Sequence, residues 1–206
     1  MDVKTAFLHG ELNSDVYVNP PEGFTVGANK VLKLKKALYG LRESSRKCID
    51  SSEILKAYVD SDFASDLTDR KSTTGIVVKL FNNPVLWKVQ KQKIVSRAST
   101  HAEYYALAEC VTEVLPLQGL LSELNINATP TTICEDNSGA LSLAMNGKFT
   151  KNSKHIDVSF HFVHDYILKN QIVVEKINTV DQPADILTKS LPFPRFVKLR
   201  EMLNLS

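Results

Sequence analysis

The chain has 206 residues, of which 43% are hydrophobic and 23% charged, as in an ordinary globular protein of one domain or one domain plus a fragment. It has no apolar run long enough to cross a bilayer, and its N-terminus lacks the apolar core of a signal peptide, which excludes a membrane span and argues against secretion. The three cysteines are far apart and fit neither a disulfide framework nor a metal cluster, so we expect an intracellular protein of the cytoplasm or nucleus.

The segment before residue 50 has no clear hydrophobic period and is too short to bury a core of its own. After it, hairpin strands come first and helices alternate with strands later, which predicts a mixed sheet covered by helices. The predicted strands are Ile54–Phe63, Thr74–Phe81, Pro84–Val89, a short one at 93–97, Thr131–Cys134 and Gln171–Ile177. The predicted helices are one from Thr100 that kinks or restarts at Pro116, Ser138–Met145, Ile156–Leu168, a short one opened by Pro183, and Phe193–Leu203.

Basic residues are concentrated in two stretches, 81–102 and 137–156, that contain no acid. Such a separation of charge suits a protein that holds a polyanion near a carboxylate-bound metal. From composition alone, a solvated lysine face is the simpler explanation. The basic residues concerned are Lys88, Lys91, Lys93, Arg97, Lys148, Lys151 and Lys154.

Four acids stand at the ends of predicted elements. Asp60 lies near the end of the first predicted strand, on the same face as Asp62, and Asp136 lies just past the strand TTIC. Glu103 lies in the first turn of the long helix, on the apolar stripe that should face the sheet, and Asp185 lies in the first turn of a short helix. Carboxylates that converge at element ends suggest a site for a hard divalent cation such as Mg²⁺.

Each of these acids also has a structural explanation. Glu103 follows Thr100 by three residues, as in a capping box, and Asp136 could cap the helix that begins near Ser138. Asp185 stands where the dipole of a helix favours a negative charge. Two acids on one face of a core-forming first strand are harder to explain in this way, and this favours the cation site.

A zinc site on a later helix is a second metal hypothesis. In the predicted helix Ile156–Leu168, Asp157, His161 and His164 share one face, and His155 lies just before it. A structural helix face with polar ends is the simpler interpretation.

Seven short stretches after residue 54 occur in an order and spacing that match a known family. They are Tyr58–Ala64, Asp69–Gly75, Lys91–Lys93, Ser99–Tyr104, Asp136–Ala140, Lys154–Val158 and Ala184–Lys189. Together with Trp87 and His161-Phe162, they resemble the ribonuclease H domain of copia-type retrotransposon polyproteins. One departure is His101, where that family usually has an acid.

The beginning of the chain resembles another part of the same polyprotein. Asp2–Gly10 and Lys36–Arg42 are similar to the fingers and palm of its reverse transcriptase, whereas the rest of the palm, the thumb and the connection have no counterpart. We therefore expect a truncated reverse transcriptase fragment at residues 1–50, without polymerase activity, followed by a ribonuclease-H-like domain at 54–206.

The resemblance implies a ribonuclease-H-like α/β fold, with a five-stranded mixed sheet and helices on both faces. It implies a metal-dependent endonuclease that cuts the RNA strand of RNA–DNA hybrids with Mg²⁺, or Mn²⁺ in its place. The implied catalytic residues and metal ligands are Asp60, Glu103, Asp136 and Asp185, with Asp62 and Asp181 as alternatives. The two basic stretches would contact the phosphates of the hybrid, and neither a small-molecule cofactor nor a membrane is implied.

A catalytically impaired, nucleic-acid-binding relic of the same polyprotein is the alternative function. The lost polymerase normally helps to grip the hybrid, whereas the retention of all four acids favours the active enzyme. The sequence leaves both functions open.

Overall fold

The computed structural model describes residues 15, 17–18, 31–35, 53–146 and 157–205, without the side chains of 157–160, and the chain divides into two units, residues 1–51 and 52–206. In the first unit, the described residues include two short antiparallel strands, β1 (Tyr17–Val18) and β2 (Leu32–Lys33). Among the described residues of the chain, no helix is long and apolar enough to cross a membrane.

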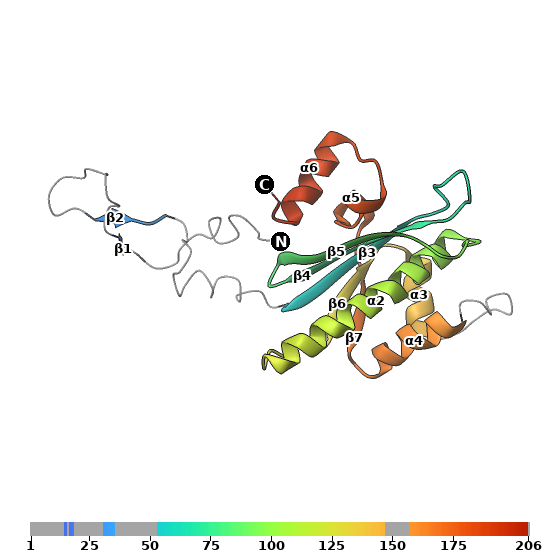
Figure 1. Cartoon of the computed structure of the whole chain (residues 1–206), viewed down its shortest axis with the longest axis horizontal. Helices are drawn as coiled ribbons and strands as arrows, with labels where there is room; N and C mark the ends of the chain where they lie inside the picture. Colours follow the sequence, from blue (N-terminus) through green and yellow to red (C-terminus); the bar gives the residue numbers. More distant parts are fainter. Residues whose placement is uncertain (1–14, 16, 19–30, 36–52, 147–156, 206) are drawn as a thin grey trace. The chain divides into compact units, whose positions relative to one another are not determined.

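The second unit is built around a five-stranded mixed sheet (Figure 1). The strands are arranged in the order β5-β4-β3-β6-β7. The first three are antiparallel neighbours, and β6 and β7 run parallel to β3. The predicted sheet is therefore confirmed. The bounds are β3 Leu55–Asp62, β4 Thr73–Leu80, β5 Asn83–Lys91, β6 Thr131–Glu135 and β7 Ile172–Lys176.

The short strand expected at 93–97 is wrong, because these residues form the loop that leads into the long helix. The edge strand β5 ends at Lys91, and Gln92 is the first residue after it. Its backbone N–H donates to the carbonyl of Ser72, and its side chain turns into the interior. The segment after it therefore leaves the sheet.

Helices cover both faces of the sheet, as expected (Figure 1). One face is covered by α2 (Ser99–Glu123), α3 (Ser138–Asn146) and α4 (Asp157–Leu168). The other is covered by α5 (Asp185–Thr188), preceded by the 3-10 turn Thr179–Asp181, and by α6 (Phe193–Met202). The larger core lies under the first of these two groups of helices, where the stripe Leu107, Cys110 and Val114 packs with strand residues such as Val59 and Ile76. A smaller cluster, which includes Tyr58 and Ala184, lies under the second group.

Pro116 lies inside the continuous helix α2, so of the kink or restart predicted at this residue the restart is wrong. A proline lacks the N–H group that would bind the carbonyl four residues earlier. That carbonyl belongs to Thr112, and both residues are exposed, so water can satisfy the carbonyl without a break in the helix.

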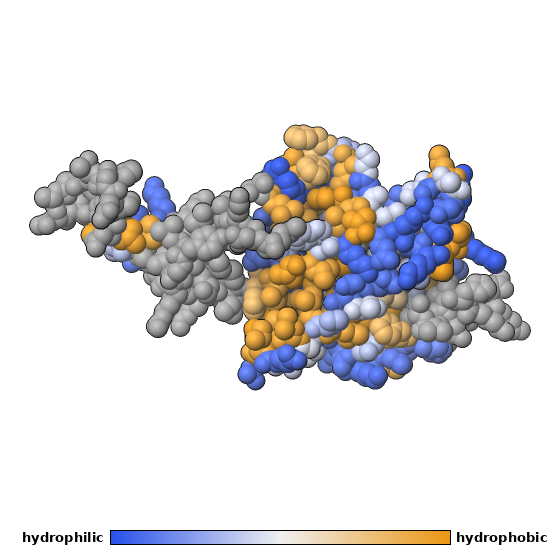
Figure 2. Space-filling view, in the orientation of Figure 1, coloured by the Kyte–Doolittle hydropathy of each residue, from blue (hydrophilic) through white to orange (hydrophobic). Residues whose placement is uncertain are grey.

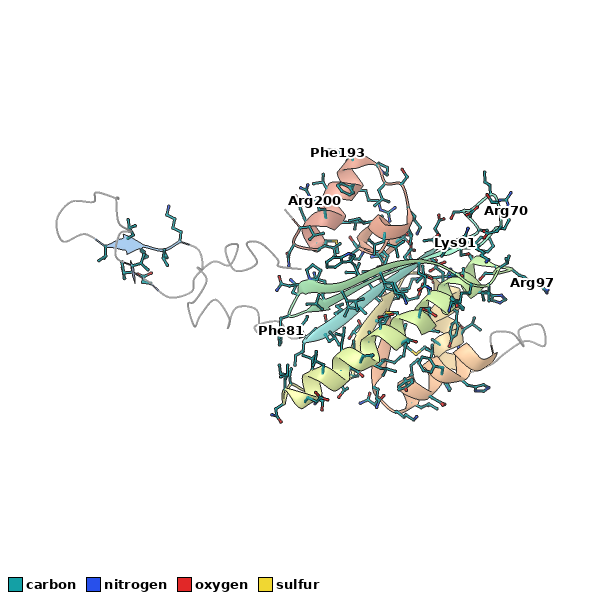
Figure 3. The ribbon with its side chains drawn as sticks, in the orientation of Figure 1. Arg70, Phe81, Lys91, Arg97, Phe193 and Arg200 are labelled. Carbon is teal, nitrogen blue, oxygen red and sulfur yellow. The ribbon has the colours of Figure 1, made fainter. Side chains whose placement is uncertain are left out.

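The two ends of the sheet differ in polarity. Hydrophilic residues cover most of the end where the 63–72 loop and the start of α2 lie, and hydrophobic residues gather toward the opposite end (Figure 2). Arg70, Lys91 and Arg97 are at the hydrophilic end, whereas Phe81 is at the other (Figure 3). Strand β3 runs toward the hydrophilic end, so the acids at its C-terminus lie there too.

Candidate active site

Three of the predicted acids come together at the hydrophilic end of the sheet. One carboxylate oxygen from each of Asp60, Glu103 and Asp136 lies within 4.8 Å of the others. The parallel pairing of β3 and β6 brings the ends of these strands to the same edge, and the first turns of α2 place Glu103 beside them. Asp60 is fully buried and Glu103 is 6% exposed. The arrangement offers a cation only oxygen ligands, the kind that Mg²⁺ prefers.

The capping roles considered for these acids are performed by other residues or not at all. Helix α2 begins at Ser99, and its cap residue, Ala98, makes no side-chain hydrogen bond. Helix α3 is capped by Asn137, whose side-chain oxygen accepts from the N–H groups of Gly139 (2.9 Å) and Ala140 (3.0 Å). The alternative explanation for Asp136 as a helix cap is therefore wrong.

Asp185, the fourth predicted acid, is buried at the start of α5 and lies outside this group of three. It is joined to Asp60 through Lys189, whose Nζ is 2.8 Å from an oxygen of each carboxylate. The Thr188 hydroxyl donates to the other oxygen of Asp60, and Arg195 donates to the other oxygen of Asp185. The segment 188–195 therefore supplies hydrogen-bond donors to both acids.

Glu135 is a buried acid that the sequence prediction missed. It is the last residue of β6 and is 0% exposed, with one carboxylate oxygen accepting from the N–H of Asn137 at 2.8 Å. Its Oε2 has no hydrogen-bond partner, and neither has Oε2 of Glu103. The two-residue period of the strand could have predicted this burial, because Glu135 shares its strand face with Ile133, which faces the main core.

Burial and mutual repulsion make these carboxylates hard to ionise. Burial, together with the charges of Glu135, Asp60 and Asp136, raises the pKa of Glu103 to about 10. Burial also raises the pKa of Glu135 well above its usual range. For Asp185, burial raises the pKa although the hydrogen bond from Lys189 opposes it. Without a cation, Glu103 therefore holds its proton at neutral pH.

Two buried glutamines fix the backbone around the acids. The side-chain amide of Gln92 donates to Ser61, Thr74 and the Ala102 carbonyl, at 2.9–3.3 Å, and thereby ties β3 and β4 to the first turn of α2. The amide of Gln182 donates to the carbonyls of Val59 and Cys134, one in each of β3 and β6. Val59 and Ser61 flank Asp60, and Ala102 directly precedes Glu103. Cys134 lies two residues before Asp136, so the two amides position the site.

Gly75 lets α5 approach the sheet closely. It pairs with Asp60 across the β3–β4 ladder. A Cβ atom at this position would lie 2.6 Å from a methyl carbon of Thr188, which is far inside normal contact. The absence of a side chain is therefore what allows Thr188 and Lys189 to reach Asp60.

The alternative ligands lie at the margin of the site. Asp62 ends β3 and is partly exposed, and Asp181 pairs with Lys198 of α6. Asp60, Glu103 and Asp136 form the only cluster of potential metal ligands in the described residues.

The residues of the zinc hypothesis are only partly described. His155 and the side chain of Asp157 lie outside the described residues. His161 is exposed, and Nδ1 of His164 lies 3.1 Å from the carbonyl oxygen of Ala144.

The basic residues of the first stretch differ in how their charges are compensated. Lys88 pairs with Glu109 (3.2 Å) and Glu113 (2.8 Å) of α2. Lys91 pairs with two aspartates of the 63–72 loop. Lys93 and Arg97 are exposed, and the structure shows no ion pair for either within its described ranges. Of the other basic residues, Lys148, Lys151 and Lys154 lie outside the described residues.

Comparisons with known proteins support the relationship that the motifs predict. Residues 1–97 match the family model "Reverse transcriptase (RNA-dependent DNA polymerase)". The match extends past residue 50, through strands that here form part of the five-stranded sheet.

Curated relatives are the retrovirus-related Pol polyproteins of two plant transposons. The chain is 33% identical over 175 residues to that of TNT 1-94 from Nicotiana tabacum, and 41% identical over 138 residues to that of RE1 from Arabidopsis thaliana. These matches cover 84% and 66% of the chain, but only 13% and 9% of the two polyproteins.

A solved structure shows the same fold. The N-terminal ribonuclease H domain of a Mycobacterium tuberculosis protein, solved as a fusion with maltose-binding protein, aligns with a TM-score of 0.50 and 12% identity. The alignment covers 71% of this chain and 96% of that one. At this identity the likeness concerns the fold alone. The chain is thus related to the Pol polyproteins of retrotransposons, and its second unit has the ribonuclease-H-like fold.

Proposed function

We propose that the second unit is a metal-dependent nuclease of the ribonuclease H type, which hydrolyses the RNA strand of RNA–DNA hybrids. The observation that carries the proposal is the approach of Asp60, Glu103 and Asp136 to within 4.8 Å of one another on a ribonuclease-H-like sheet. Polymerase activity is not part of the proposal, because residues 55–91 of the reverse transcriptase match form three strands of this sheet.

The residues present fit a divalent cation. All ligands offered are carboxylate oxygens, and the buried Oε2 atoms of Glu103 and Glu135 have no partner to compensate their burial. Asp60, Glu103 and Asp136 would hold the cation, with Mg²⁺ or Mn²⁺ as the natural choice. When bound, such a cation stabilises negative charge on the attacking and leaving oxygens of phosphodiester hydrolysis.

The chain itself would orient the substrate and keep the carboxylates in place. The amides of Gln92 and Gln182 hold the backbone on which the acids are mounted. Lys93 and Arg97 are exposed, Arg97 lies at the same end of the sheet (Figure 3), and both would hold phosphates of the hybrid. Lys88 and Lys91 are already paired with acids and have less charge to offer.

The test is an assay of the purified chain on a hybrid with end-labelled RNA. We expect cleavage of the RNA strand with Mg²⁺ or Mn²⁺, none with a chelator present, and none of the DNA strand or of single-stranded RNA. Binding of the hybrid without cleavage in either cation would instead support the catalytically impaired, nucleic-acid-binding alternative.

A further inference from the structure

Lys189 stands between two buried carboxylates that the sequence predicts as metal ligands. Its Nζ lies 2.8 Å from Oδ1 of Asp60 and 2.8 Å from Oδ1 of Asp185, and both carboxylates are 0% exposed. A single ammonium group therefore bridges the two acids, as a shared cation would.

The carboxylates of the site differ in whether their oxygens accept hydrogen bonds. Each of the four oxygens of Asp60 and Asp185 accepts a hydrogen bond from Thr188, Lys189 or Arg195. In contrast, Oε2 of Glu103 and Oε2 of Glu135 are buried without a partner.

The ion pairs divide the acids in the same way. Two acids and two bases meet around Asp185, so the charges there are balanced. No lysine or arginine among the described residues pairs with Glu103, Glu135 or Asp136. A cation placed beside Glu103 gains uncompensated ligands, whereas one placed between Asp60 and Asp185 must first displace an ammonium.

We propose that Lys189 is a built-in cation of this site, which occupies the place of a second divalent ion between Asp60 and Asp185. The site therefore takes one divalent cation, held by Asp60, Glu103 and Asp136, and not two. This inference rests on the proposed function, because it concerns the same carboxylates. It makes Lys189 a positioning residue that holds the Asp60 carboxylate in place for the remaining cation.

The experiment counts Mn²⁺ ions bound to the full chain by electron paramagnetic resonance, and measures melting temperature with a chelator. The variants are Lys189→Met, which removes the charge, and Lys189→Arg, which keeps it. We expect one ion per chain in the wild type and in Lys189→Arg, and two in Lys189→Met. Without metal, Lys189→Met should melt below the wild type, and Mn²⁺ should recover much of the loss.

Lys198→Met is the matched control, because Lys198 pairs with an acid outside the group of three. It should leave the number of bound ions unchanged. Two ions in the wild type, or the same number in the wild type and Lys189→Met, would overturn the inference. If Lys189→Met does not fold, the number of Mn²⁺ ions bound to the wild type alone tests the inference, which requires one ion and not two.

The outcomes also separate this inference from the proposed function. A wild type that binds one Mn²⁺ and gains a second on Lys189→Met, but cuts no hybrid, supports the role of Lys189 and refutes the nuclease. No ion in either protein overturns both. If the wild type binds no ion and Lys189→Met binds one, the result supports Lys189 as the replacement for a divalent ion but refutes the cation site at Glu103.

Discussion

Asp60 and Asp185 are buried acids that share the ammonium of Lys189, whereas Glu103 and Glu135 are buried acids without a cationic partner among the described residues. Both pairs lie at the end of one sheet, and Asp60 is close enough to Glu103 to influence its pKa. The difference shows that buried carboxylates at this site differ in whether a cationic side chain compensates their charge. The chain neutralises one pair itself and leaves the other to protons or to an added cation.

The strongest test of this comparison is Asp136→Asn. An amide oxygen is a poorer ligand than a carboxylate for a hard cation, so Mg²⁺ binding should weaken and cleavage should fall. The loss should exceed the roughly 10–100-fold effect of residues that only support a metal ligand. Loss of one charge from a repelling cluster should leave the unfolding free energy unchanged or slightly higher. Cleavage rates and urea denaturation measure both effects, with Asp165→Asn on the exposed face of α4 as the control. An active Asp136→Asn protein would contradict the site.

The next test is the pH dependence of stability in a chelator. Glu103 keeps its proton in the folded chain up to about pH 10 but loses it near its usual pKa when unfolded, so the unfolded state binds fewer protons in between. Stability should therefore fall as pH rises from 5.5 to 8.5, by up to about 1.4 kcal/mol per pH unit for each such group.

Glu103→Gln should remove the contribution of that group to the slope, and Mg²⁺ should oppose the fall in the wild type. Urea denaturation at several pH values measures the slope. Glu123→Gln, at the exposed end of α2, is the matched control. The same slope in Glu103→Gln and the wild type would show that Glu103 is not the group that holds the proton.

A smaller effect is expected when the comparison is extended to basic residues of the surface. Replacement of Lys93 and Arg97 by Gln should reduce the slope of log affinity against log salt for a hybrid by roughly one per lost phosphate contact. Lys88→Gln should change the slope much less, because Lys88 is paired with two glutamates. Fluorescence anisotropy in a chelator, where cleavage is blocked, measures the slopes. Equal slopes in all variants would show that these residues are only solvated surface.

The smallest effect should follow removal of the first unit. Every residue of the two hydrophobic clusters lies between 54 and 203, so the second unit has a complete core of its own. We expect residues 53–206 to unfold with a free energy within about 0.5 kcal/mol of that of the whole chain. This would support the proposed division into a reverse transcriptase fragment, 1–50, and a ribonuclease-H-like domain, 54–206. A loss of several kcal/mol would indicate that the two units stabilise each other.

The sequence predicted the parts of the fold that depend on local periodicity. Strands β3 to β7 and the apolar stripe of α2 follow from periods of two and 3.6 residues, and the pairing of β3 with β6 brings Asp60 near Asp136. The restart predicted at Pro116 was wrong because the cost of a proline depends on whether the freed carbonyl faces solvent, which a local pattern does not reveal.

The supporting residues of the site were not predictable in this way. Gln182 contacts Val59 across 123 positions, and Lys189 contacts Asp60 across 129. No local period connects residues so far apart. The sequence motif contained Lys189, but only the structure shows that its charge lies between two acids.

These distant contacts also bear on the order in which the molecule is assembled. A ribosome makes Asp60, Glu103 and Asp136 well before the segment that carries Lys189, and contacts that close such long loops form late because of their entropic cost. We expect refolding to protect backbone amides of β3 and α2 from hydrogen exchange before those of α5. Protection of 185–189 as early as β3 would contradict this order. Until α5 docks beside Gly75, Asp60 has no ammonium partner, so the last helices complete the electrostatics of a core that has already formed.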